Sequence, residues 1–498
     1  MIKTQLTYNL VHKWYTSENI SVIGSAFLKN ELLKEKNLSA YFQSANDEIS
    51  FVEKLQKLSG HFSVIIDTNT SFLIALDNIR TFPLFIHKKE TDILLSDTIQ
   101  ESNPDWNEAE VVNFLKVYCA LENNTLLKDW QQLQAGEYAV ISKDDASLSI
   151  KSYYHHIQQV SRETDLQQKL SESETQLVDN AIAYARNRTI LIPLSGGYDS
   201  RYLLALLKER NYAKIECYTY GRKDSYEALI AKNVCEKLNI KWHFIEYTDT
   251  LLQTFFSETW NSYSTLNHQY SSLPHEQDFF ALQYLKENNL LSEDCVIMNG
   301  FCQDIHAGSF MEPVKNFDLQ KFIFHKYQLK LSLPAYDNSW NGYQEWLVKN
   351  RLSKFIINSV RVYEYFGLDF YLPFWQTDWI NFWYSLPNEL LLHQQFYNDY
   401  LFNGILKKHK IDFKKPSHET TNKLYSLKRI SKAILPGSIT RILQMQNSKN
   451  HSKDVNNTLF LYEEIYKRLK DKPAEKDFRI NNIHALYLLQ NLKEKHQL

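Results

Sequence analysis

Short apolar runs alternate with helix-like segments from residue 188 onward, and this alternation constrains the fold more than any other feature of the sequence. The runs RTILIPL (188–194), KIECYTY (214–220) and KWHFIEY (241–247) have the character of buried strands, and the helix-like YLLALLKERN and YEALIAKNVCEKLN separate them. A fourth run, DCVIMNG (294–300), follows a helical segment around 275–290. Strands and helices in this order predict right-handed βαβ units and a parallel sheet. The sequence therefore favours an α/β fold for this region.

The chain divides by pattern into four parts. Residues 1–160 are predicted to form a sheet-based domain, because they contain β-rich runs bounded by turn-forming residues: HFSVIID (61–67), SFLIALD (71–77), PLFIHKK (83–89) and EYAVISK (137–143). Residues 165–440 hold the βαβ region and then, from about 310, a segment rich in Trp, Tyr and Phe that we expect to cover the sheet as helices. We expect a polar linker at 444–458 and a terminal helical piece at 459–498.

Composition narrows the class of protein. A chain of 498 residues can bury two or three cores, and it has no apolar run near the roughly 20 residues that a membrane span needs. The N-terminus lacks the apolar stretch of a secretory signal, so we expect a cytoplasmic protein that does not bind a membrane. A net charge of -2 argues against nucleic acid and favours a small or medium-sized metabolite as partner. Five widely spaced cysteines without CxxC pairs predict reduced thiols and no metal framework: Cys119, Cys217, Cys235, Cys295 and Cys302.

The segment Leu194-Ser195-Gly196-Gly197-Tyr198-Asp199-Ser200 lies between an apolar strand and the start of a helix. Two glycines in that setting let backbone N–H groups turn inward, and the helix N-terminus adds a partial positive charge, so the loop suits a phosphate group. Asp199 would repel bare phosphate, which makes it a ligand for a bridging Mg²⁺. The alternative is a plain strand-to-helix turn in which Asp or Ser caps the helix.

Two further strand ends carry polar or glycine-containing loops: Thr219-Tyr220-Gly221, and Asn299-Gly300-Phe301-Cys302-Gln303-Asp304. Ligands of open α/β sheets bind beyond the carboxyl ends of the strands, which is where all three loops fall. The lysine of a Walker loop is absent, so the three strand ends predict a nucleotide site of another kind.

These residues resemble a known family. SGGYDS is similar to the SGGxDS signature of asparagine synthetase, β-lactam synthetase, lasso-peptide cyclases and argininosuccinate or GMP synthetases. NGFCQDIHAG occupies the place of the asparagine synthetase run SGEGSDELFGG, and residues 361–387 resemble its stretch that ends in RVPFLD and a following SLP. Three motifs in the correct order over about 200 residues make the resemblance specific.

The resemblance implies a role for each matching position. Pyrophosphate would be held by Ser195, Gly196, Gly197, Asp199 and Ser200, with Leu194 beside them; adenine would lie against Tyr220, Asn299 and Gly300. Asp304 would join Asp199 on Mg²⁺, although it could instead cap a helix. A C-terminal lysine assists catalysis in the family, and Lys423 is favoured here over Lys414 and Lys415.

The N-terminal part also resembles that family. Residues 60–85, 94–97 and 126–141 look like the Ntn-hydrolase-type glutaminase domain of asparagine synthetase, an αββα fold. The nucleophile of such a domain is a cysteine at the second position, and this chain has Ile2 there. The resemblance thus implies a glutaminase-like domain without glutaminase activity, followed by an adenine-nucleotide α-hydrolase-like parallel sheet covered by helices.

The function implied is an ATP- and Mg²⁺-dependent ligase that adenylates a carboxylate and forms an amide with ammonia or an amine, releasing AMP and pyrophosphate. Phe301 and Ile305 stand where the family has two glutamates, so we expect an acceptor or a donor other than the aspartate and ammonia of asparagine synthesis, in polysaccharide, peptide or secondary-metabolite tailoring. The alternatives are conventional asparagine formation and an inactive nucleotide-binding scaffold. A homodimer is one candidate assembly.

Overall fold

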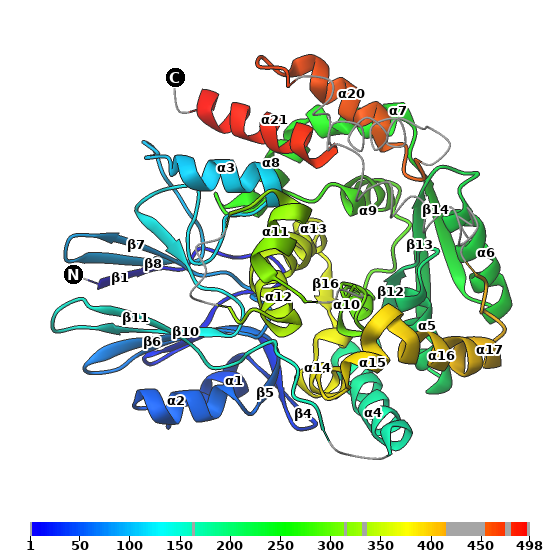
Figure 1. Ribbon diagram of the computed structural model, residues 1–498, viewed down its shortest axis with the longest axis horizontal. Helices are drawn as coiled ribbons and strands as arrows, with labels where there is room; N and C mark the ends of the chain where they lie inside the picture. The colour runs from blue at the N-terminus through cyan, green and yellow to red at the C-terminus, as the bar shows by residue number, and fades with distance from the viewer. Residues whose placement is uncertain are drawn as a thin grey trace.

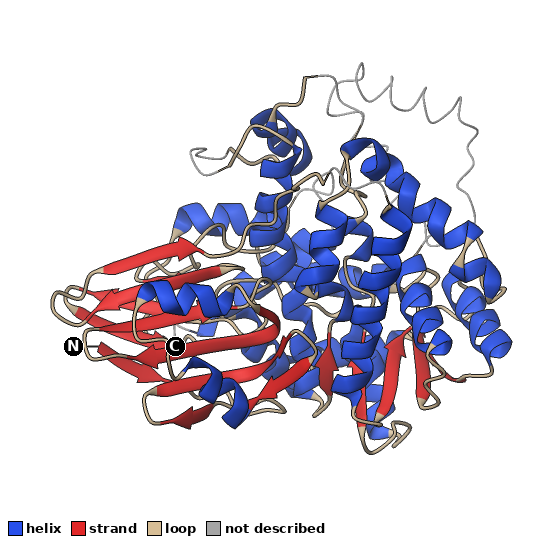
Figure 2. Ribbon diagram, turned by 90° about the horizontal axis from the view of Figure 1, so that it is seen from below, coloured by secondary structure: helices blue, strands red, loops and turns tan. Residues whose placement is uncertain are grey.

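The computed structural model contains two groups of strands that lie side by side. It describes residues 2–161, 165–312, 316–330, 336–414, 454–473 and 480–495. The N-terminal strands gather on the left of Figure 1, the parallel sheet lies on the right, and helices fill the space between and above them. Figure 2 shows the same separation from below. The α/β fold expected from the sequence, with a layered N-terminal part and a helix-covered parallel sheet, is confirmed.

Two stacked sheets form the N-terminal part. The smaller sheet has the order β1 (Ile2–Gln5), β8 (Asp92–Ser96), β7 (Phe85–Lys89) and β9 (Trp130–Gln132). The larger sheet has the order β11 (Leu148–Ser152), β10 (Glu137–Ser142), β6 (Ser71–Leu76), β5 (Leu58–Asp67), β3 (Ile20–Leu28) and β2 (Tyr15–Ser17), with β4 (Glu31–Lys34) beside β3.

Apolar side chains hold these layers together. Ile65 and Ile74 of the larger sheet meet Ile86 and Ile93 of the smaller sheet in a buried cluster between them. Helices α1 (Glu35–Phe42) and α2 (Glu48–Leu55) pack on the larger sheet, and α3 (Glu108–Val117) packs on the smaller one. The result is an α-β-β-α arrangement.

The second part is built on a five-stranded sheet whose neighbouring strands are all parallel. Its order is β14 (Lys241–Glu246), β13 (Ile215–Gly221), β12 (Thr189–Pro193), β15 (Cys295–Met298) and β16 (Asp369–Tyr371). The connecting helices are α5 (Tyr198–Glu209) and α6 (Tyr226–Leu238), and α9 (Gln277–Glu287) precedes β15. All four residues of β15 are buried, as expected for a strand covered on both faces.

The remaining helices surround this sheet. The helix α4 (Leu166–Ala185) precedes β12. The others are α7 (Asp249–Leu252), η1 (Gln253–Phe256), α8 (Glu258–His268), α10 (Gln303–His306), α11 (Leu319–Tyr327), α12 (Trp340–Trp346), the π-helix η2 (Leu347–Ile356), η3 (Ile357–Val360), α13 (Arg361–Tyr365), η4 (Pro373–Trp375), α14 (Thr377–Tyr384), α15 (Asn388–Leu391), η5 (Leu392–Gln394), α16 (Gln395–Asn403), α17 (Ile405–Lys408), α20 (Thr458–Arg468) and α21 (Ile480–Lys495).

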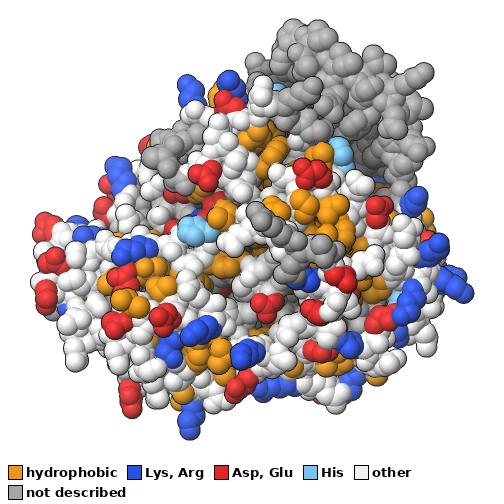
Figure 3. All heavy atoms as spheres, turned by 60° about the horizontal axis from the view of Figure 1, so that its bottom comes forward, with side chains coloured by type: hydrophobic (Ala, Val, Ile, Leu, Met, Phe, Trp, Pro, Cys, Tyr) orange, Lys and Arg blue, Asp and Glu red, His pale blue; other side chains and the backbone are white. Residues whose placement is uncertain are grey.

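The linker expected at 444–458 falls mostly outside the described residues. Its last part is ordered by Asp454, whose carboxylate accepts hydrogen bonds from the backbone N–H groups of Thr458 at 3.0 Å and Leu459 at 2.8 Å and so caps α20. Within the described ranges, no helix combines the length and apolarity needed to cross a bilayer. On the face drawn in Figure 3, basic and acidic side chains are interspersed.

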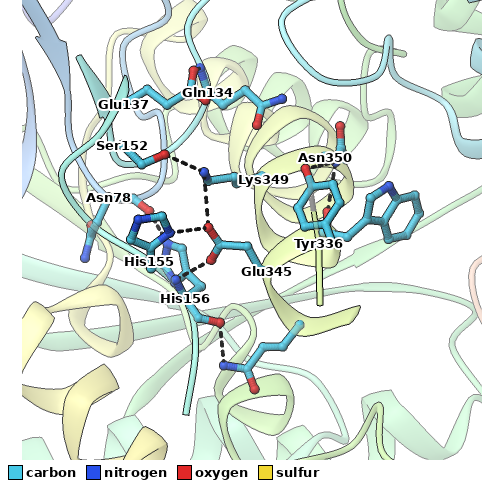
Figure 4. A network of polar contacts seen from close by, with 12 residues as sticks. Asn78, Gln134, Glu137, Ser152, His155, His156, Tyr336, Glu345, Lys349 and Asn350 are labelled. Carbon is cyan, nitrogen blue, oxygen red and sulfur yellow. Dashed lines mark hydrogen bonds and ion pairs between the residues drawn. The ribbon is translucent and has the colours of Figure 1, made fainter. Parts of the chain in front are cut away.

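A buried ion pair joins the N-terminal sheets to the helical layer (Figure 4). Lys349 on η2 lies 3.1 Å from Glu345 on α12, and its ammonium group donates to Ser152 Oγ of β11 at 2.8 Å. Glu345 also accepts hydrogen bonds from the backbone N–H of His156 and, at 3.1 Å, from the ring of His155. Both charged side chains are only 8% exposed, so this pair is sealed from solvent.

The Glu345 carboxylate is stabilised in its charged form despite its burial. Burial by itself raises its pKa, but the His155 hydrogen bond and the Lys349 charge outweigh that effect and lower the pKa to about 2. The Glu345 carboxylate is therefore ionised at neutral pH.

Replacing Lys349 by methionine should weaken the contact between the two parts by about 3 kcal/mol, because it leaves a buried carboxylate without its cation. The expected result is a lower midpoint of urea unfolding, measured by tryptophan fluorescence. Lys321→Met is the matched control, since Lys321 pairs with Asp318 and is 87% exposed. Equal midpoints for the two variants would contradict a structural role for the buried pair.

Candidate active site

A cavity of about 510 Å³ lies beyond the carboxyl ends of β12, β13 and β15. The residues around it come from all three loops that the sequence predicted to meet there. It is lined by Leu194, Ser195, Gly197, Asp199, Ser200, Tyr220, Asn299, Gly300 and Asp304, together with residues that the sequence did not identify. A volume of this size suits a small-molecule ligand.

The loop after β12 leads directly into α5, which begins at Tyr198 with Gly197 as its N-cap. No side chain caps this helix end. Within the loop, Ser195 Oγ accepts a hydrogen bond from the N–H of Gly197 at 3.0 Å, and Ser200 Oγ accepts one from the N–H of Ser195 at 3.4 Å. A long helix with an uncapped N-terminus at a cavity wall is a favourable place for an anion.

Gly196 differs from its neighbours because it does not line the cavity. It lies against α6, where a Cβ atom on Gly196 would come within 3.1 Å of the Cα and Cγ atoms of Glu227. The second glycine of the loop therefore faces the cavity, and the first allows the loop to pack closely on the next helix.

Arg201 holds the loop from behind, a role that no pattern in the sequence indicates. Its guanidinium donates to the carbonyl oxygens of Gly197 at 2.8 Å and Gly196 at 3.1 Å, and also to those of Ile411 at 2.9 Å and Phe413 at 2.7 Å. The two glycine carbonyls thus turn toward Arg201, which is not part of the cavity wall.

The loop after β15 approaches the start of α5 closely at Gly300. A Cβ atom at this position would lie 2.7 Å from the backbone nitrogen of Ser200 and 2.8 Å from the carbonyl carbon of Asp199. Any larger residue would push the two loops apart, so glycine is required here.

Asp199 and Asp304 are held next to each other by this approach. The backbone N–H of Asp304 donates to Asp199 Oδ2 at 3.0 Å, and the Tyr397 hydroxyl donates to Asp199 Oδ1 at 2.8 Å. Burial raises the pKa of the nearby Cys302 thiol well above its usual value, and the charges of Asp304 and Asp199 raise it further. Cys302 is therefore a neutral thiol between two acids.

The pair of aspartates fits a magnesium ion in its chemistry. Mg²⁺ prefers carboxylate oxygen and usually takes one or two carboxylates, with phosphate oxygens and waters as the other ligands. In the described part of the chain, no group of three or more His, Cys, Asp or Glu side chains is placed to hold a metal ion. Asp199 and Asp304 would therefore bind Mg²⁺ only together with a phosphate-bearing substrate.

The other end of the cavity is aromatic. Tyr220 stacks on Tyr247 with ring centroids 4.9 Å apart and planes 8° from parallel. The side-chain amide of Asn299 donates to the Tyr363 hydroxyl at 3.2 Å, and that hydroxyl donates to Asp278 at 3.2 Å. Tyr220 and Asn299 thus both line the cavity, together with Asp278, which was not anticipated from the sequence.

Lys423 and Lys415 lie outside the described residues. Lys414 is described, and its ammonium group lies 5.9 Å from the ring centroid of Phe402 rather than at the cavity wall. No lysine, arginine or histidine is found among the described residues that line the cavity, whereas four acids are: Asp199, Glu227, Asp278 and Asp304.

At the other end of the chain, Ile2 opens β1 and pairs with Ile93 of β8. Its side chain packs on the apolar cluster between the two N-terminal sheets. Asp97, which follows β8, accepts hydrogen bonds from the backbone N–H groups of Thr7 and Tyr8 and from the Trp14 indole. The start of the chain thus makes apolar and structural contacts with its neighbours, and none of the residues named in these contacts carries a thiol.

Comparison with known proteins gives a partial match. Residues 176–274, about a fifth of the chain, match the family model described as asparagine synthase. No curated protein matches the chain.

Solved structures give weak similarities. The NH3-dependent NAD synthetase of Campylobacter jejuni is 18% identical with a TM-score of 0.21, over 29% of this chain and 61% of that one. The glutamine phosphoribosylpyrophosphate amidotransferase of B. subtilis is 12% identical with a TM-score of 0.20, over 49% of this chain and 75% of that one. The glutamine-dependent NAD+ synthetase of Acinetobacter baumannii is 9% identical with a TM-score of 0.24, over 80% of this chain and 62% of that one.

This chain therefore spans less than two thirds of the length of both NAD synthetases. TM-scores this low do not indicate a shared function. The match to the family model is local but well placed, because it includes β12, β13, β14 and the whole SGGYDS loop. The part of the chain that forms one wall of the cavity is asparagine synthase-like.

Proposed function

We propose that this protein is an ATP-dependent carbon–nitrogen ligase that adenylates a carboxylate and transfers the acyl group to ammonia or an amine. The observation that carries the proposal is that the SGGYDS loop, which contains Asp199, lies beside Asp304 in the wall of a single cavity. The asparagine synthase-like character of residues 176–274 supports it independently.

The first step joins the substrate carboxylate to ATP. A carboxylate oxygen attacks the α-phosphorus, a new P–O bond forms, and the bond to the β-phosphate oxygen breaks, so that pyrophosphate leaves. The uncapped end of α5 and the hydroxyls of Ser195 and Ser200 orient the phosphates. Asp199 and Asp304 would hold Mg²⁺, which would neutralise part of the phosphate charge.

The second step forms the amide. The nitrogen lone pair attacks the acyl carbon, the bond from that carbon to the phosphate oxygen breaks, and AMP leaves with the electron pair. The protein contributes orientation of the two reactants. Lys423 is our candidate for the lysine that assists at the phosphates.

The acyl substrate is proposed to be larger than aspartate, such as a sugar acid or a peptide carboxylate, in tailoring of a polysaccharide, peptide or secondary metabolite. Aspartate would bring two carboxylates into a cavity whose described lining holds four acids and no base. Phe301, which lines the cavity where the family has a glutamate, also favours a different acceptor.

The proposal is tested by ATP–pyrophosphate exchange with a panel of carboxylates in the presence of Mg²⁺. Exchange with a sugar acid or peptide, and not with aspartate, is the expected result. Exchange with aspartate alone would establish conventional asparagine formation. ATP binding without exchange under any condition would establish a nucleotide-binding scaffold, and either outcome overturns the proposal.

Asp304→Asn should weaken binding of Mg²⁺–ATP about tenfold or more, because it removes one of two carboxylates from the proposed metal site. Titration calorimetry with Mg²⁺–ATP measures the effect. Asp224→Asn is the matched control, since Asp224 follows the neighbouring strand β13 and is 79% exposed. If both variants bind Mg²⁺–ATP like the wild type, Asp304 has no metal role.

The N-terminal part is proposed to lack glutaminase activity, because Ile2 has no nucleophilic atom and packs against the apolar layer between the sheets. Incubation with glutamine should release no glutamate, with or without Mg²⁺–ATP, in an assay that detects glutamate directly. Release that ATP accelerates would refute the loss of this activity.

A further inference from the structure

A short segment at the edge of the cavity contacts both of the aspartates that we assign to the metal. Gln394, the N-cap of α16, donates from its side-chain amide to the backbone carbonyl oxygen of Asp304 at 3.2 Å. Three residues later, the Tyr397 hydroxyl donates to Asp199 Oδ1 at 2.8 Å. Gln394 and Tyr397 both line the cavity. One stretch of chain therefore reaches the two loops that carry the acidic pair.

The backbone is strained where this segment begins. His393 has a φ of 59° and Gln394 a φ of 56°, so two consecutive residues other than glycine lie in the left-handed region. Such a conformation costs free energy and persists only where the surrounding structure imposes it, which is most often at functional sites. Here it starts α16 at the point from which Gln394 and Tyr397 reach the aspartates.

The ring of Tyr397 is fixed by packing. The residue is 1% exposed, and its ring centroid lies 5.6 Å from that of Trp383 and 5.9 Å from that of Tyr202, in edge-to-face arrangements. Burial, and after it the charge of Asp199, raise the pKa of Tyr397 well above its usual value, so the phenol keeps its proton. A neutral hydroxyl on an immobile ring is a donor with a fixed direction.

The Asp199 carboxylate is thus held through both of its oxygens. Oδ1 accepts from Tyr397, and Oδ2 accepts from the backbone N–H of Asp304 at 3.0 Å. A carboxylate oxygen has two lone pairs, so a hydrogen bond to it is compatible with metal binding by the same oxygen. Carboxylates that bind metal ions are commonly oriented by hydrogen bonds of this kind.

We infer that Tyr397 and Gln394 are positioning residues for the metal. Tyr397 fixes the Asp199 carboxylate in the orientation that binds Mg²⁺, and Gln394 fixes the backbone that carries Asp304. This inference rests on the proposed function and deepens it, because it names the side chains that hold the two metal-binding carboxylates in place.

A purely structural role for Tyr397, as a tie between α5 and α16, has a different consequence. Loss of such a tie would lower the stability of the fold without changing how much Mg²⁺ strengthens the binding of ATP. The two roles are therefore separated by the ratio of the ATP affinities measured with Mg²⁺ and with EDTA.

The experiment measures this ratio by titration calorimetry of the full-length protein with ATP. The wild type is expected to bind ATP more tightly in Mg²⁺ than in EDTA. Tyr397→Phe should reduce this gain about tenfold, because it removes the hydrogen bond that orients one metal-binding carboxylate. The affinity in EDTA should stay the same.

Tyr400→Phe is the matched control. Tyr400 lies about one turn further along α16, and its hydroxyl donates to the Glu174 carboxylate at 2.8 Å. The variant therefore removes the same kind of hydrogen bond from the same helix, at a residue that does not line the cavity. It should keep the wild-type gain.

Gln394→Asn is a second test that decides the matter if Tyr397→Phe does not fold. Asparagine tolerates the left-handed backbone, but its side chain is shorter by one methylene, so the contact with Asp304 is lost. The gain from Mg²⁺ should again fall, with the affinity in EDTA unchanged.

A wild-type gain in Tyr397→Phe, or equal losses of affinity in Mg²⁺ and in EDTA, overturns the inference, and the same results in Gln394→Asn do so if the first variant does not fold. A gain that falls as far in Tyr400→Phe, or a wild type without any gain, also overturns it. Failure of the wild type to bind ATP in either condition would instead refute the proposed function.

Discussion

The close approach of two backbones at Gly300 is the constraint on which the candidate site depends. Parallel strands β12 and β15 are neighbours, so the loops that follow them begin side by side. Only a residue without a side chain lets the second loop come near the nitrogen of Ser200, and this nearness allows the N–H of Asp304 to reach Asp199. The contact between Asp304 and Asp199 is thus a product of strand order and of the absence of a side chain at Gly300.

Much of the fold and half of the site could be predicted, because their signals are local. Strands such as β12 and β15 are short and almost entirely apolar, and the SGGYDS loop is recognisable by its place between a strand and a helix. Arg201 and Tyr397 could not be found in this way. Arg201 reaches the carbonyl of Phe413, and Tyr397 reaches Asp199, across about 200 positions in each case, and nothing in either residue's surroundings in sequence marks the contact.

Helix types were also less predictable than helix positions. The aromatic region after 310 was expected to be helical, and most of its described residues are. However, β16 joins the parallel sheet, and η2 is a π-helix that carries Lys349 and Asn350 into the contact with the N-terminal part. Asn350 accepts from the backbone N–H of Glu122 at 2.7 Å. Apolar periodicity in the sequence does not distinguish a π-helix from an α-helix, so this helix type could not be predicted.

Gly221 has a φ of +121°, and a Cβ atom there would lie 2.5 Å from the carbonyl oxygen of Val455. The adjoining N–H of Arg222 donates to that same oxygen at 2.7 Å, and Asn456 lines the cavity. Part of the cavity wall is therefore supplied by a stretch of chain more than two hundred positions downstream of Gly221. The short stretch before α20 is therefore part of the candidate site, and Val455 and Asn456 join the C-terminal part of the chain to the loop that follows β13.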